Sequence, residues 1–297
     1  MSEQRTSTDI TVSIVNWNTK EELAGCLDSV LRQQGVGFDV VVVDNGSSDG
    51  SAEMVKTRYP QAVLIATSDN KGFAGGQNEA FAFSRGRYIL LLNPDARMIG
   101  DDVLANIIKF GDSESKVGIF GTRILNTDGS LQFSARRFPT LGAGIFRNSI
   151  LGRLFPRNRY VKEYLMTDWD HDAMRDVDWV SGAAMVLRRA ALDDIGPLDE
   201  GFFMYCEDVD ICYRAHEKGW RVCYYPGATV THKIAASSDL AQVRMIYQFH
   251  KSMLRFFNKH YARTWPVHKR LFVLLGLTFR CTAFIAINVV KRALRMG

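Results

Sequence analysis

The stretch FDVVVVDNGSSDGS, residues 38–51, is the part of the sequence that decides the fold. Its unbroken valine run favours a β-strand buried on both faces, because a half-exposed strand would alternate apolar and polar residues. The strand is expected to end at Asp44. A polar loop and a Ser/Asp helix start follow it. A buried strand, a polar loop and a helix in this order form the repeating unit of a parallel α/β sheet.

The same order recurs through the N-terminal half of the chain. The expected strands are 11–17, 38–44, 62–67 and 87–93, and the expected helices are 20–34, 48–59 and 75–86. The sequence therefore predicts a Rossmann-like, mostly parallel sheet with helices on both faces. Residues 140–176 are less regular and are interpreted as facing an acceptor or a membrane. A further strand is expected in 178–189.

Polar residues follow each of these four strands. They are Asn16 and Asn18; Asp44 and Asn45; Asn70, Gly72 and Asn78; and Asn93 and Asp95. Each is an ordinary turn residue by itself, but ligands of such sheets bind at the carboxyl ends of the strands. Four polar loops at one edge indicate a nucleotide or cation site. The chain has neither GxxxxGK[ST] nor GxGxxG, which excludes a P-loop NTPase and the dinucleotide-binding fingerprint.

Charge is distributed unevenly along the 297 residues, of which 46% are hydrophobic. All 32 acidic residues lie in 1–239, whereas the 37 basic residues divide into 26 there and eleven in 240–297. An acidic body thus carries a basic tail, and basic tails meet nucleic acid or anionic membranes. The length permits one large domain or two, and we expect a folded domain in 1–239 and a helical tail in 240–297.

The apolar content of the tail favours a membrane over nucleic acid. Residues 244–259 predict an amphipathic helix with a basic face, which suits a membrane surface or packing on its own domain. Residues 271–290 are long enough to span a bilayer, but Arg280 would cost roughly 2.5–3.5 kcal/mol at its centre. Both flanks are basic, so no crossing direction is indicated, and a segment lying in the membrane or re-entering it is favoured.

The start of the chain and its cysteines indicate a cellular compartment. The first ten residues, MSEQRTSTDI, lack the apolar run of a signal peptide. The five cysteines show no metal-binding spacing, and an odd, scattered count is typical of a reducing cytoplasm. Together with the tail, these features predict a protein at the cytoplasmic face of the cell membrane.

The chain resembles the inverting family 2 glycosyltransferases of the GT-A fold. The motifs that carry the resemblance are VSIVNWN, VVVDNGSSDGS, NKGFAGGQN, LLLNPDA, SGAAMVLRR, GFFMYCEDVDICYRAHEKGW and THK, in the family's order from Val12 to Lys233. Within the family the chain is most similar to rhamnosyltransferases that act on polyprenyl-diphosphate-linked sugars. This resemblance implies a nucleotide-diphosphate sugar as donor and a lipid-linked sugar as acceptor.

The resemblance also implies roles for particular residues. The positions that would bind the nucleotide sugar are Asn16, Asn18, Asp44, Asn45, Asn70, Gly72, Asn78 and Asn93. Asp95 stands at the family's DxD metal position, where this chain has Asn93-Pro94-Asp95 and so keeps one carboxylate. His232 matches a position that completes the metal site, although a lone histidine is also common in structural roles. Mg²⁺ suits a site of few protein ligands and substrate phosphates, and Mn²⁺ accepts a histidine more readily.

The acids of EDVD, residues 207–210, are the expected catalytic group. By resemblance Asp208 is the base that takes the proton of the acceptor hydroxyl, with Glu207 as an orienting neighbour. A base gains from the raised pKa that neighbouring acids and apolar residues supply. Acids also favour the first turn of a helix, and Asp210 could pair with Arg214 one turn later.

Five further residues complete the expected site. Arg136 and Arg137 suit a donor or acceptor diphosphate, with solvated surface as the alternative. Trp179, Ser181 and Gly182 are placed near the acceptor by resemblance.

The donor is expected to be dTDP-L-rhamnose. The alternatives are a family 2 transferase with a UDP-hexose donor or a non-lipid acceptor, a sugar nucleotidyltransferase, and a non-enzymatic nucleotide-sugar-binding scaffold.

Overall fold

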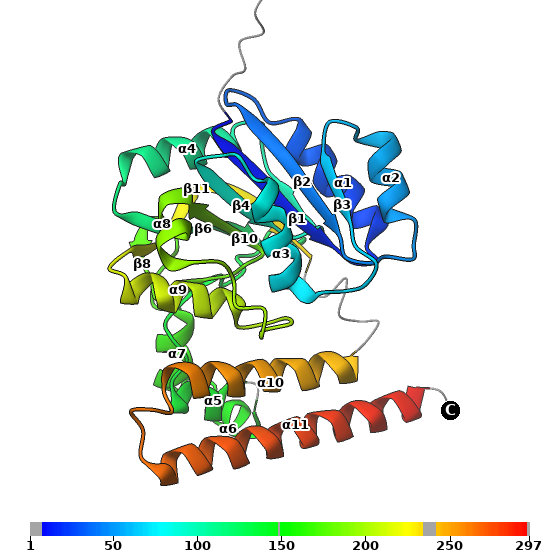
Figure 1. Cartoon of the computed structure of the whole chain (residues 1–297). Helices are drawn as coiled ribbons and strands as arrows, with labels where there is room; N and C mark the ends of the chain where they lie inside the picture. Colours follow the sequence, from blue (N-terminus) through cyan, green and yellow to red (C-terminus); the bar gives the residue numbers. More distant parts are fainter. Residues whose placement is uncertain (1–7, 148, 234–241, 296–297) are drawn as a thin grey trace, which may run out of the picture.

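The structure is a computed structural model that describes residues 8–147, 149–233 and 242–295. Its centre is a nine-stranded mixed sheet (Figure 1). In spatial order, its strands are β3 Val63–Ala66, β2 Phe38–Asp44, β1 Ile10–Asn16, β4 Tyr88–Leu92, β10 Ala184–Arg188, β6 Val117–Leu125, β11 Arg221–His232 and β5 Ala96–Met98, with β8 Arg175–Asp176 also paired to β11. A second sheet joins β7 Ala135–Arg136 to β9 Trp179–Val180.

The N-terminal part of the sheet is parallel, as predicted. Strands β3, β2, β1 and β4 run in one direction, with Asn16 opposite Asp44 in the register of β1 and β2. Strand β10 runs antiparallel to both neighbours, and β5 is antiparallel to β11. The later strands therefore add a mixed half that the βαβ pattern of the sequence did not predict.

Helices cover both faces of this sheet. They are α1 Lys20–Leu31, α2 Ser51–Arg58 and α4 Val103–Ser113 on one face, and α3 Gly72–Phe83, α8 Arg189–Ile195 and α9 Glu207–Glu217 on the other. The side chains of β4 alternate between the two cores: Leu90 and Leu92 join the first, Ile89 and Leu91 the second. Each core is thus closed by helices, which confirms the expected α/β architecture.

Residues 140–176 are more regular than expected. They form three short helices, α5 Leu141–Phe146, α6 Ile150–Leu154 and α7 Arg159–Leu165. The side chains of Thr140, Ser149 and Asn158 each accept a hydrogen bond from the backbone N–H three residues later. These N-caps satisfy free N–H groups of the first turns and fix where the helices begin.

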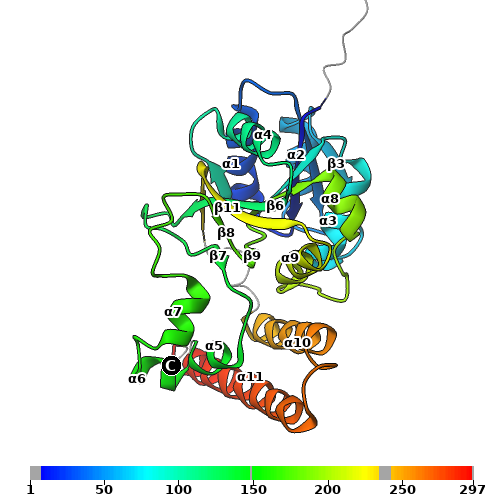
Figure 2. The same ribbon diagram turned by 90° about the vertical axis from the view of Figure 1, so that its left-hand side faces the viewer.

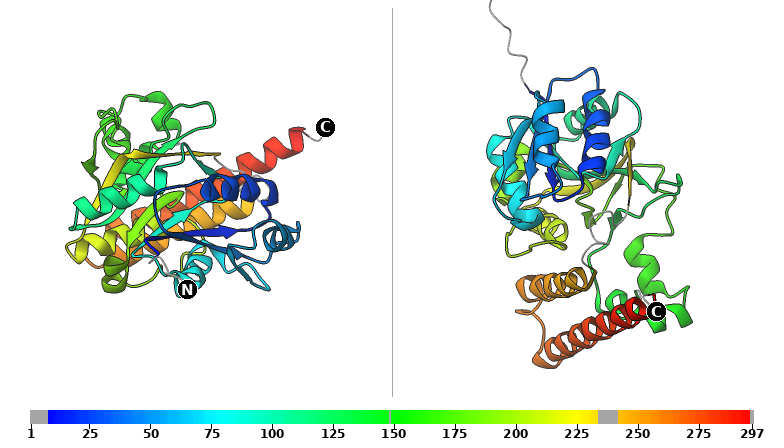
Figure 3. Two further views of the ribbon diagram at one scale, coloured as in Figure 1. Left: turned by 90° about the horizontal axis from the view of Figure 1, so that it is seen from above. Right: turned by 90° about the vertical axis from the view of Figure 1, so that its right-hand side faces the viewer.

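The tail forms an antiparallel pair of helices, α10 Gln242–His260 and α11 Val267–Arg295. Helix α10 lies between the α/β domain and α11, and α5 and α6 lie beside α11 (Figures 1 and 2). The side view repeats this layering of domain, α10 and α11 (Figure 3). Both helices confirm the sequence prediction, whereas the expected boundary between 239 and 240 lies outside the described residues.

The basic face of α10 contacts the domain. Arg255 and Lys259 both pair with Asp199, at 2.7 and 2.8 Å. On the other side of α10, Phe257 packs against Val273 of α11. Of the two environments considered for this helix, the structure shows packing on its own domain.

Candidate active site

Two buried polar side chains end neighbouring parallel strands. Asn16 closes β1 and Asp44 closes β2, and the Asn16 amide donates to Asp44 Oδ1 over 2.9 Å. The same amide donates to Ser47 Oγ at 3.2 Å, and the Ser47 backbone N–H donates to Asp44 Oδ2. The carboxylate is therefore held in one orientation at the strand edge where ligands of such sheets bind.

Asn18 joins the loops after β1 and β2. Its side-chain oxygen accepts from the Ser48 backbone N–H at 2.8 Å, and its own N–H donates to Ser47 Oγ at 2.9 Å. Asn18 itself is in the left-handed region, with φ of 52°. Asparagine tolerates this conformation better than most residues. Asn16, Asn18 and Asp44 are thus brought together, as the resemblance implied.

The loop before α3 forms the next wall. Asn45 donates to Asn70 Oδ1 and to the Gly72 carbonyl, at 3.1 and 2.9 Å, and accepts from the Lys71 N–H. Gly72 has φ of +78°, and a Cβ there would stand 2.2 Å from the Phe203 carbonyl oxygen. Only glycine fits this junction, which ties α3 to the segment leading into α9.

Asn78 has a different place from the one expected. Its amide donates to the Leu198 carbonyl and to Glu200, and its oxygen accepts from the Leu198 N–H. All of these partners lie in the segment before α9. Asn78 therefore positions that segment through these hydrogen bonds, a role that no feature of the NKGFAGGQN motif indicated, and a nucleotide contact by Asn78 stays a prediction.

Asp95 and His232 meet although they are distant in sequence. Strand β5 pairs with the end of β11 so that His232 lies opposite Ala96, directly beside Asp95. The distance from His232 Nε2 to Asp95 Oδ1 is 3.3 Å, and Asn93 Nδ2 lies 3.1 Å from the same nitrogen. Asp95 Oδ1 is buried and has no hydrogen-bond partner among the described residues.

Gln132, which sequence analysis missed, orients this histidine. Its Oε1 lies 2.8 Å from His232 Nδ1, and its amide donates to Asn126 Oδ1 at 2.9 Å. The amide of Asn126 donates in turn to Ser130 Oγ. This chain of donors assigns the proton to Nδ1 and leaves a lone pair on Nε2, which lies beside the Asp95 carboxylate and can accept from the Asn93 amide. Gln132 lies on an irregular segment, so no sequence periodicity marks it.

A cation fits between Asp95 and His232. An imidazole lone pair and a carboxylate oxygen repel each other unless a proton or metal ion lies between them. The described residues contain no group of three or more His, Cys, Asp or Glu that could hold a metal. The chain thus supplies two donors of the oxygen and nitrogen type, and the remaining coordination positions suit phosphates and water.

Glu207 and Asp208 lie in the first turn of α9. Asp208 Oδ2 accepts from the Gly182 N–H at 3.1 Å, and its Oδ1 accepts from the Val209 N–H at 2.9 Å. Glu207 is 6% exposed, and its Oε2 has no hydrogen-bond partner among the described residues. The two carboxyl groups therefore have different surroundings: Asp208 is held by two donors, and Glu207 is enclosed.

These surroundings shift the pKa values of Glu207 and Asp208 to different extents. Burial, and then the charge of Asp208, raise the pKa of Glu207 well above its ordinary value. Burial also raises the pKa of Asp208, but the N–H groups of Gly182 and Val209 and the Arg136 cation oppose the shift. Asp208 can therefore be the ionised partner while Glu207 keeps its proton, which is the division of roles a general base requires.

The backbone before these acids is strained. Tyr205 and Cys206 are consecutive non-glycine residues with φ of 70° and 67°. Such conformations cost about 1–3 kcal/mol each and persist only where the surroundings enforce them. Helix α10 contributes here, because Ser252 donates to the Met204 carbonyl at 2.8 Å and Phe249 packs edge-on against Tyr205. The tail therefore helps to hold the catalytic segment.

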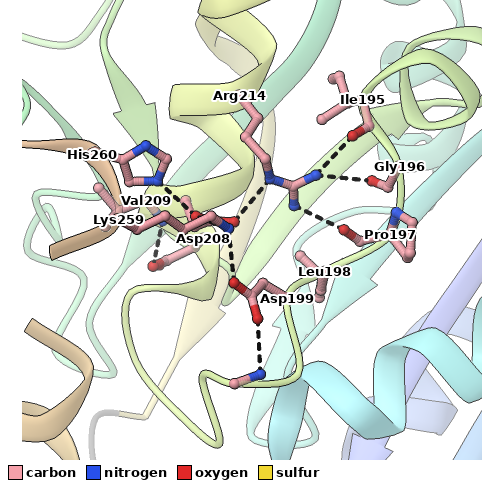
Figure 4. A network of polar contacts seen from close by, with 12 residues as sticks. Ile195, Gly196, Pro197, Leu198, Asp199, Asp208, Val209, Arg214, Lys259 and His260 are labelled. Atoms are coloured by element: carbon pink, nitrogen blue, oxygen red, sulfur yellow. Dashed lines mark hydrogen bonds and ion pairs between the residues drawn. The ribbon is translucent and has the colours of Figure 1, made fainter. Parts of the chain in front are cut away.

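The first turn of α9 is also anchored by ion pairs. Asp210 is fully buried and contacts Arg214, as predicted, at 2.9 Å, and also Lys259 and His260 of α10, each at 2.7 Å. Arg214 in addition donates to the carbonyls of Ile195 and Pro197. In Figure 4 dashed lines join Arg214 to Ile195, Gly196 and Pro197, and Lys259 and His260 lie close by.

The remaining expected residues divide into two groups. Arg137 is paired with Asp178 at 3.0 Å, on the exposed side of the small sheet, and Trp179 is 5% exposed and donates to the Arg137 carbonyl. Trp179 is therefore closed to a ligand, whereas Arg137 is exposed and lines a cavity with Tyr160 and Tyr261. Arg136 stacks over the Trp179 ring at 4.9 Å and makes no ion pair with a described carboxylate. Gly182 lies against Asp208, where a Cβ would be 3.6 Å from the Asp208 Cβ.

Ser181 stands at the junction between β9 and β10. Its backbone N–H donates to the Ser134 carbonyl at 2.9 Å, and its hydroxyl accepts from the Ala183 N–H at 3.4 Å. The Ser181–Ala183 turn thus positions the Gly182 N–H that holds Asp208. An acceptor contact by Ser181 itself stays a prediction.

Comparison with known proteins places the chain among glycosyltransferases. A family model described as glycosyltransferase like family 2 matches residues 8–247. An N-acetylglucosaminyl-diphospho-decaprenol L-rhamnosyltransferase of Mycobacterium tuberculosis is 30% identical over 237 residues, which cover 76% of each chain. The rhamnosyltransferase WbbL of Escherichia coli is 34% identical over 171 residues, covering 54% of this chain and 60% of WbbL.

Solved structures share the fold. A mannosyltransferase from Pyrobaculum calidifontis, in complex with GDP-Man and Mn²⁺, aligns with a TM-score of 0.58 and 16% identity over 99% of this chain and 79% of its own. The GalNAc-T7 structure with UDP, GalNAc and Mn²⁺ aligns with a TM-score of 0.60 and 12% identity, over 86% of this chain and 48% of its own. At these identities the likeness shows the GT-A-like fold alone.

Proposed function

Because the chain belongs to glycosyltransferase family 2, and is thus a glycosyltransferase, we propose that it transfers L-rhamnose from dTDP-rhamnose to a polyprenyl-diphosphate-linked saccharide. The observation that carries the proposed chemistry is the Asp208 carboxylate, held by two N–H groups beside an enclosed Glu207. Similarity to the mycobacterial rhamnosyltransferase supports the choice of sugar and acceptor. A UDP-hexose donor or a non-lipid acceptor is the second candidate, on the similarity to other hexosyltransferases.

In the proposed reaction Asp208 acts as the general base. It takes the proton of the acceptor hydroxyl as the oxygen attacks the anomeric carbon, and the bond from that carbon to the donor diphosphate breaks on the opposite face. The configuration at the anomeric carbon is therefore inverted. When Glu207 is protonated, Asp208 carries the one negative charge of the pair, and the Gly182 N–H fixes the orientation of this base.

The donor is proposed to bind along the edge formed by β1, β2 and the loop before α3. Asp44 and Asn16 would contact the base, with Asn18, Asn45, Asn70 and Gly72 shaping the pocket around the nucleotide. Asp95 and His232, beside Asn93, would hold a divalent cation on the donor diphosphate. When bound, Mg²⁺ or Mn²⁺ supplies Lewis-acid stabilisation of the leaving diphosphate.

The tail is proposed to hold residues 1–239 at the cytoplasmic face of the cell membrane, with 240–297 as the associating part. Val267–Val290 is long and apolar enough to cross a bilayer, and it is the one such helix among the described residues. Its large apolar side chains are exposed, including Phe279 at 75%. A lipid-linked acceptor requires an enzyme that stays at the membrane.

The test measures transfer from radiolabelled dTDP-rhamnose to a polyprenyl-diphosphate-GlcNAc in the presence of Mg²⁺ or Mn²⁺. We expect product from the wild type and at least about a hundredfold slower transfer by Asp208→Asn. Asp193→Asn, an exposed carboxylate on α8, is the matched control and is expected to keep the wild-type rate. Similar rates for all three proteins would remove Asp208 from the chemistry. No product with this pair, but product from a UDP-hexose, would favour the second candidate.

A further inference from the structure

Three arginines from separate segments converge between the catalytic domain and the tail. Arg136 ends β7, Arg147 follows α5, and Arg280 lies in the middle of α11. Arg136 and Arg147 lie over the Tyr164 ring, at 6.0 and 5.0 Å from its centroid, and Arg147 Nη1 donates to the Tyr164 hydroxyl at 2.9 Å. Arg280 Nη1 donates to the Gly144 carbonyl at 3.1 Å, one helical turn before Arg147.

The three cations have no anionic partner. None makes an ion pair with any carboxylate in residues 8–147, 149–233 or 242–295, whereas the neighbouring Arg137 is paired with Asp178. Arg280 Nε is buried and has no hydrogen-bond partner within those ranges. Burial lowers the pKa of Arg147, and the charges of Arg136 and Arg280 act in the same direction. All three arginines are half-buried, and cations partly withdrawn from water are normally paired, so this arrangement is unfavourable unless an anion binds.

The cluster connects the catalytic carboxylate to the apolar layer. At one end, Arg136 stacks on Trp179 and is close enough to Asp208 to stabilise its ionised form. At the other end, Arg280 belongs to α11, whose outward side chains are apolar. Beside Arg147 lies a cavity of about 700 Å³ with a mixed lining, in which Phe146, Ile246 and Phe284 are apolar and Ser149, Arg153 and Asn158 are polar. A cavity with apolar walls, the positive charge of the arginines and the proposed base Asp208 thus follow one another in space.

We propose that Arg136, Arg147 and Arg280 bind the diphosphate of the lipid-linked acceptor, with the cavity beside Arg147 taking the first prenyl units. A diphosphate carries two to three negative charges, and guanidinium groups bind its oxygens in pairs. A ligand with its diphosphate here would extend its sugar past Arg136 toward Asp208. The donor diphosphate has its own place at Asp95 and His232. The inference rests on the proposed function, which it deepens by locating the acceptor.

The experiment measures binding of farnesyl diphosphate, a short prenyl diphosphate, to the full chain by tryptophan fluorescence and calorimetry. Arg147→Met and Arg280→Met remove a charge but keep an unbranched side chain. Each is expected to weaken binding by about tenfold or more, the usual effect of losing a charge-assisted hydrogen bond. Binding of dTDP is expected to stay within about twofold, because the donor site shares no residue with the cluster.

Matched controls separate the cluster from general electrostatics and from misfolding. Arg270→Met on α11 and Arg157→Met between α6 and α7 remove exposed arginines outside the cavity and are expected to bind farnesyl diphosphate like the wild type. Arg147→Lys and Arg280→Lys keep the charge and are expected to lose less than the Met variants. Equal losses in the exposed and clustered variants, or unchanged binding in Arg147→Met and Arg280→Met, would overturn the proposal.

Further binding measurements identify the source of the anion and distinguish failure of this site from failure of the proposed function. Phosphatidylglycerol vesicles and inorganic diphosphate are tested alongside farnesyl diphosphate. If the Met variants lose vesicle binding but not farnesyl diphosphate binding, the cluster binds lipid headgroups and the acceptor site is wrong. Because binding is measured without turnover, cluster-dependent farnesyl diphosphate binding with no rhamnosyl transfer would leave this site standing and reject only the proposed substrates.

Discussion

At the scale of single residues, the site depends on how hydrogen bonds divide roles between similar side chains. Asp95 has an unpartnered oxygen beside a histidine lone pair, whereas Asp44 is held by two donors and needs no cation. Both are carboxylates at the end of the same sheet. Their partners decide that Asp44 is a fixed acceptor and that Asp95 is available to a metal ion.

Gln132 provides a test of the cation site that does not depend on activity. Gln132→Leu removes the acceptor that holds the proton on His232 Nδ1, so the imidazole loses its fixed tautomer and orientation. We expect Mn²⁺ affinity in the presence of dTDP to fall about 10- to 100-fold, measured by electron paramagnetic resonance. Gln34→Leu, at an exposed position, is the control. Unchanged Mn²⁺ affinity in Gln132→Leu would show that the histidine does not ligate the metal.

Glu207 leads to a prediction about pH. Because its pKa is raised well above the ordinary value, Glu207 stays protonated over the range in which Asp208 ionises. Transfer is expected to rise with pH as Asp208 loses its proton, at a pH above the usual aspartate range. Glu207→Gln mimics the protonated acid, so the acidic limb of the rate profile should stay where the wild type has it. A shift of that limb to lower pH would mean that Glu207 is ionised beside Asp208.

The same shift affects stability. The folded pKa of Glu207 lies above the unfolded one, so the folded state binds more protons between the two values and stability falls as pH rises through that window. Glu207→Gln should remove this loss. Urea unfolding at neutral and at alkaline pH therefore provides a second readout on the same variant.

At the scale of elements, the start of α9 is held by a single helix of the tail. The strained entry contacts Phe249 and Ser252 of α10, and Asp210 in the first turn pairs with Lys259 and His260 of the same helix. The side chains that fix the proposed catalytic helix thus come from the tail, which makes α10 part of the scaffold of the proposed site.

Replacing Asp210 should uncouple the tail from α9. Asp210→Asn leaves Arg214, Lys259 and His260 facing a neutral side chain in a fully buried place, and we expect a loss of about 3 kcal/mol in the free energy of unfolding by urea. The exposed Asp193→Asn is again the control. A change below about 0.5 kcal/mol, as found at ordinary surface sites, would show that these ion pairs do not anchor the helix.

The acid dependence of the same contacts has a definite sign. Although burial opposes ionisation, Lys259 and Arg255 lower the pKa of Asp199 to about 2, and His260 and Lys259 lower the pKa of Asp210. Each contribution is present above the ordinary aspartate pKa and is lost as pH falls through the folded pKa, which is about 2 for Asp199. Asp210→Asn should therefore lose less stability than the wild type on acidification.

How far the sequence predicts this molecule differs from element to element. Strand 38–44 and the helices of the N-terminal half follow from apolar runs and turn residues, and α9 from its acidic first turn and Gly219. Contacts between distant segments do not follow, because the pairing of β5 with β11 and the meeting of Arg136, Arg147 and Arg280 depend on tertiary register. Arg280 was expected only as a cost inside an apolar segment. The hydrogen bonds by which Asn78 holds the segment before α9 also do not follow from its motif.

At the scale of the whole molecule, the layers follow an order from polar to apolar. The α/β domain carries the nucleotide edge, α10 carries ion pairs toward the domain and aromatic contacts toward α11, and α11 presents apolar side chains outward. The arginine cluster lies where these layers meet. An amphiphilic substrate could bind with its lipid in the outer layer and its sugar in the domain, so that the lipid stays out of water.

The outermost layer provides the last prediction, which concerns membrane binding. Leu275 and Phe279 are 59% and 75% exposed on α11, so polar replacements there change little in the fold. The double variant Leu275→Ser/Phe279→Ser is expected to weaken sedimentation with phosphatidylglycerol vesicles by at least about tenfold, since each side chain contributes roughly 1.5–3 kcal/mol when fully buried in lipid.

Phe83→Ser is the matched control, because Phe83 is 50% exposed on α3, in the catalytic domain and away from the tail. It should leave vesicle binding unchanged. Equal binding of the double variant and the wild type would mean that α11 is covered by something other than a membrane. Helix α11 also carries Arg280, so it has two proposed roles: holding the enzyme at the membrane surface and completing the acceptor site. If the double variant loses vesicle binding but still binds farnesyl diphosphate in detergent, the two roles are separate.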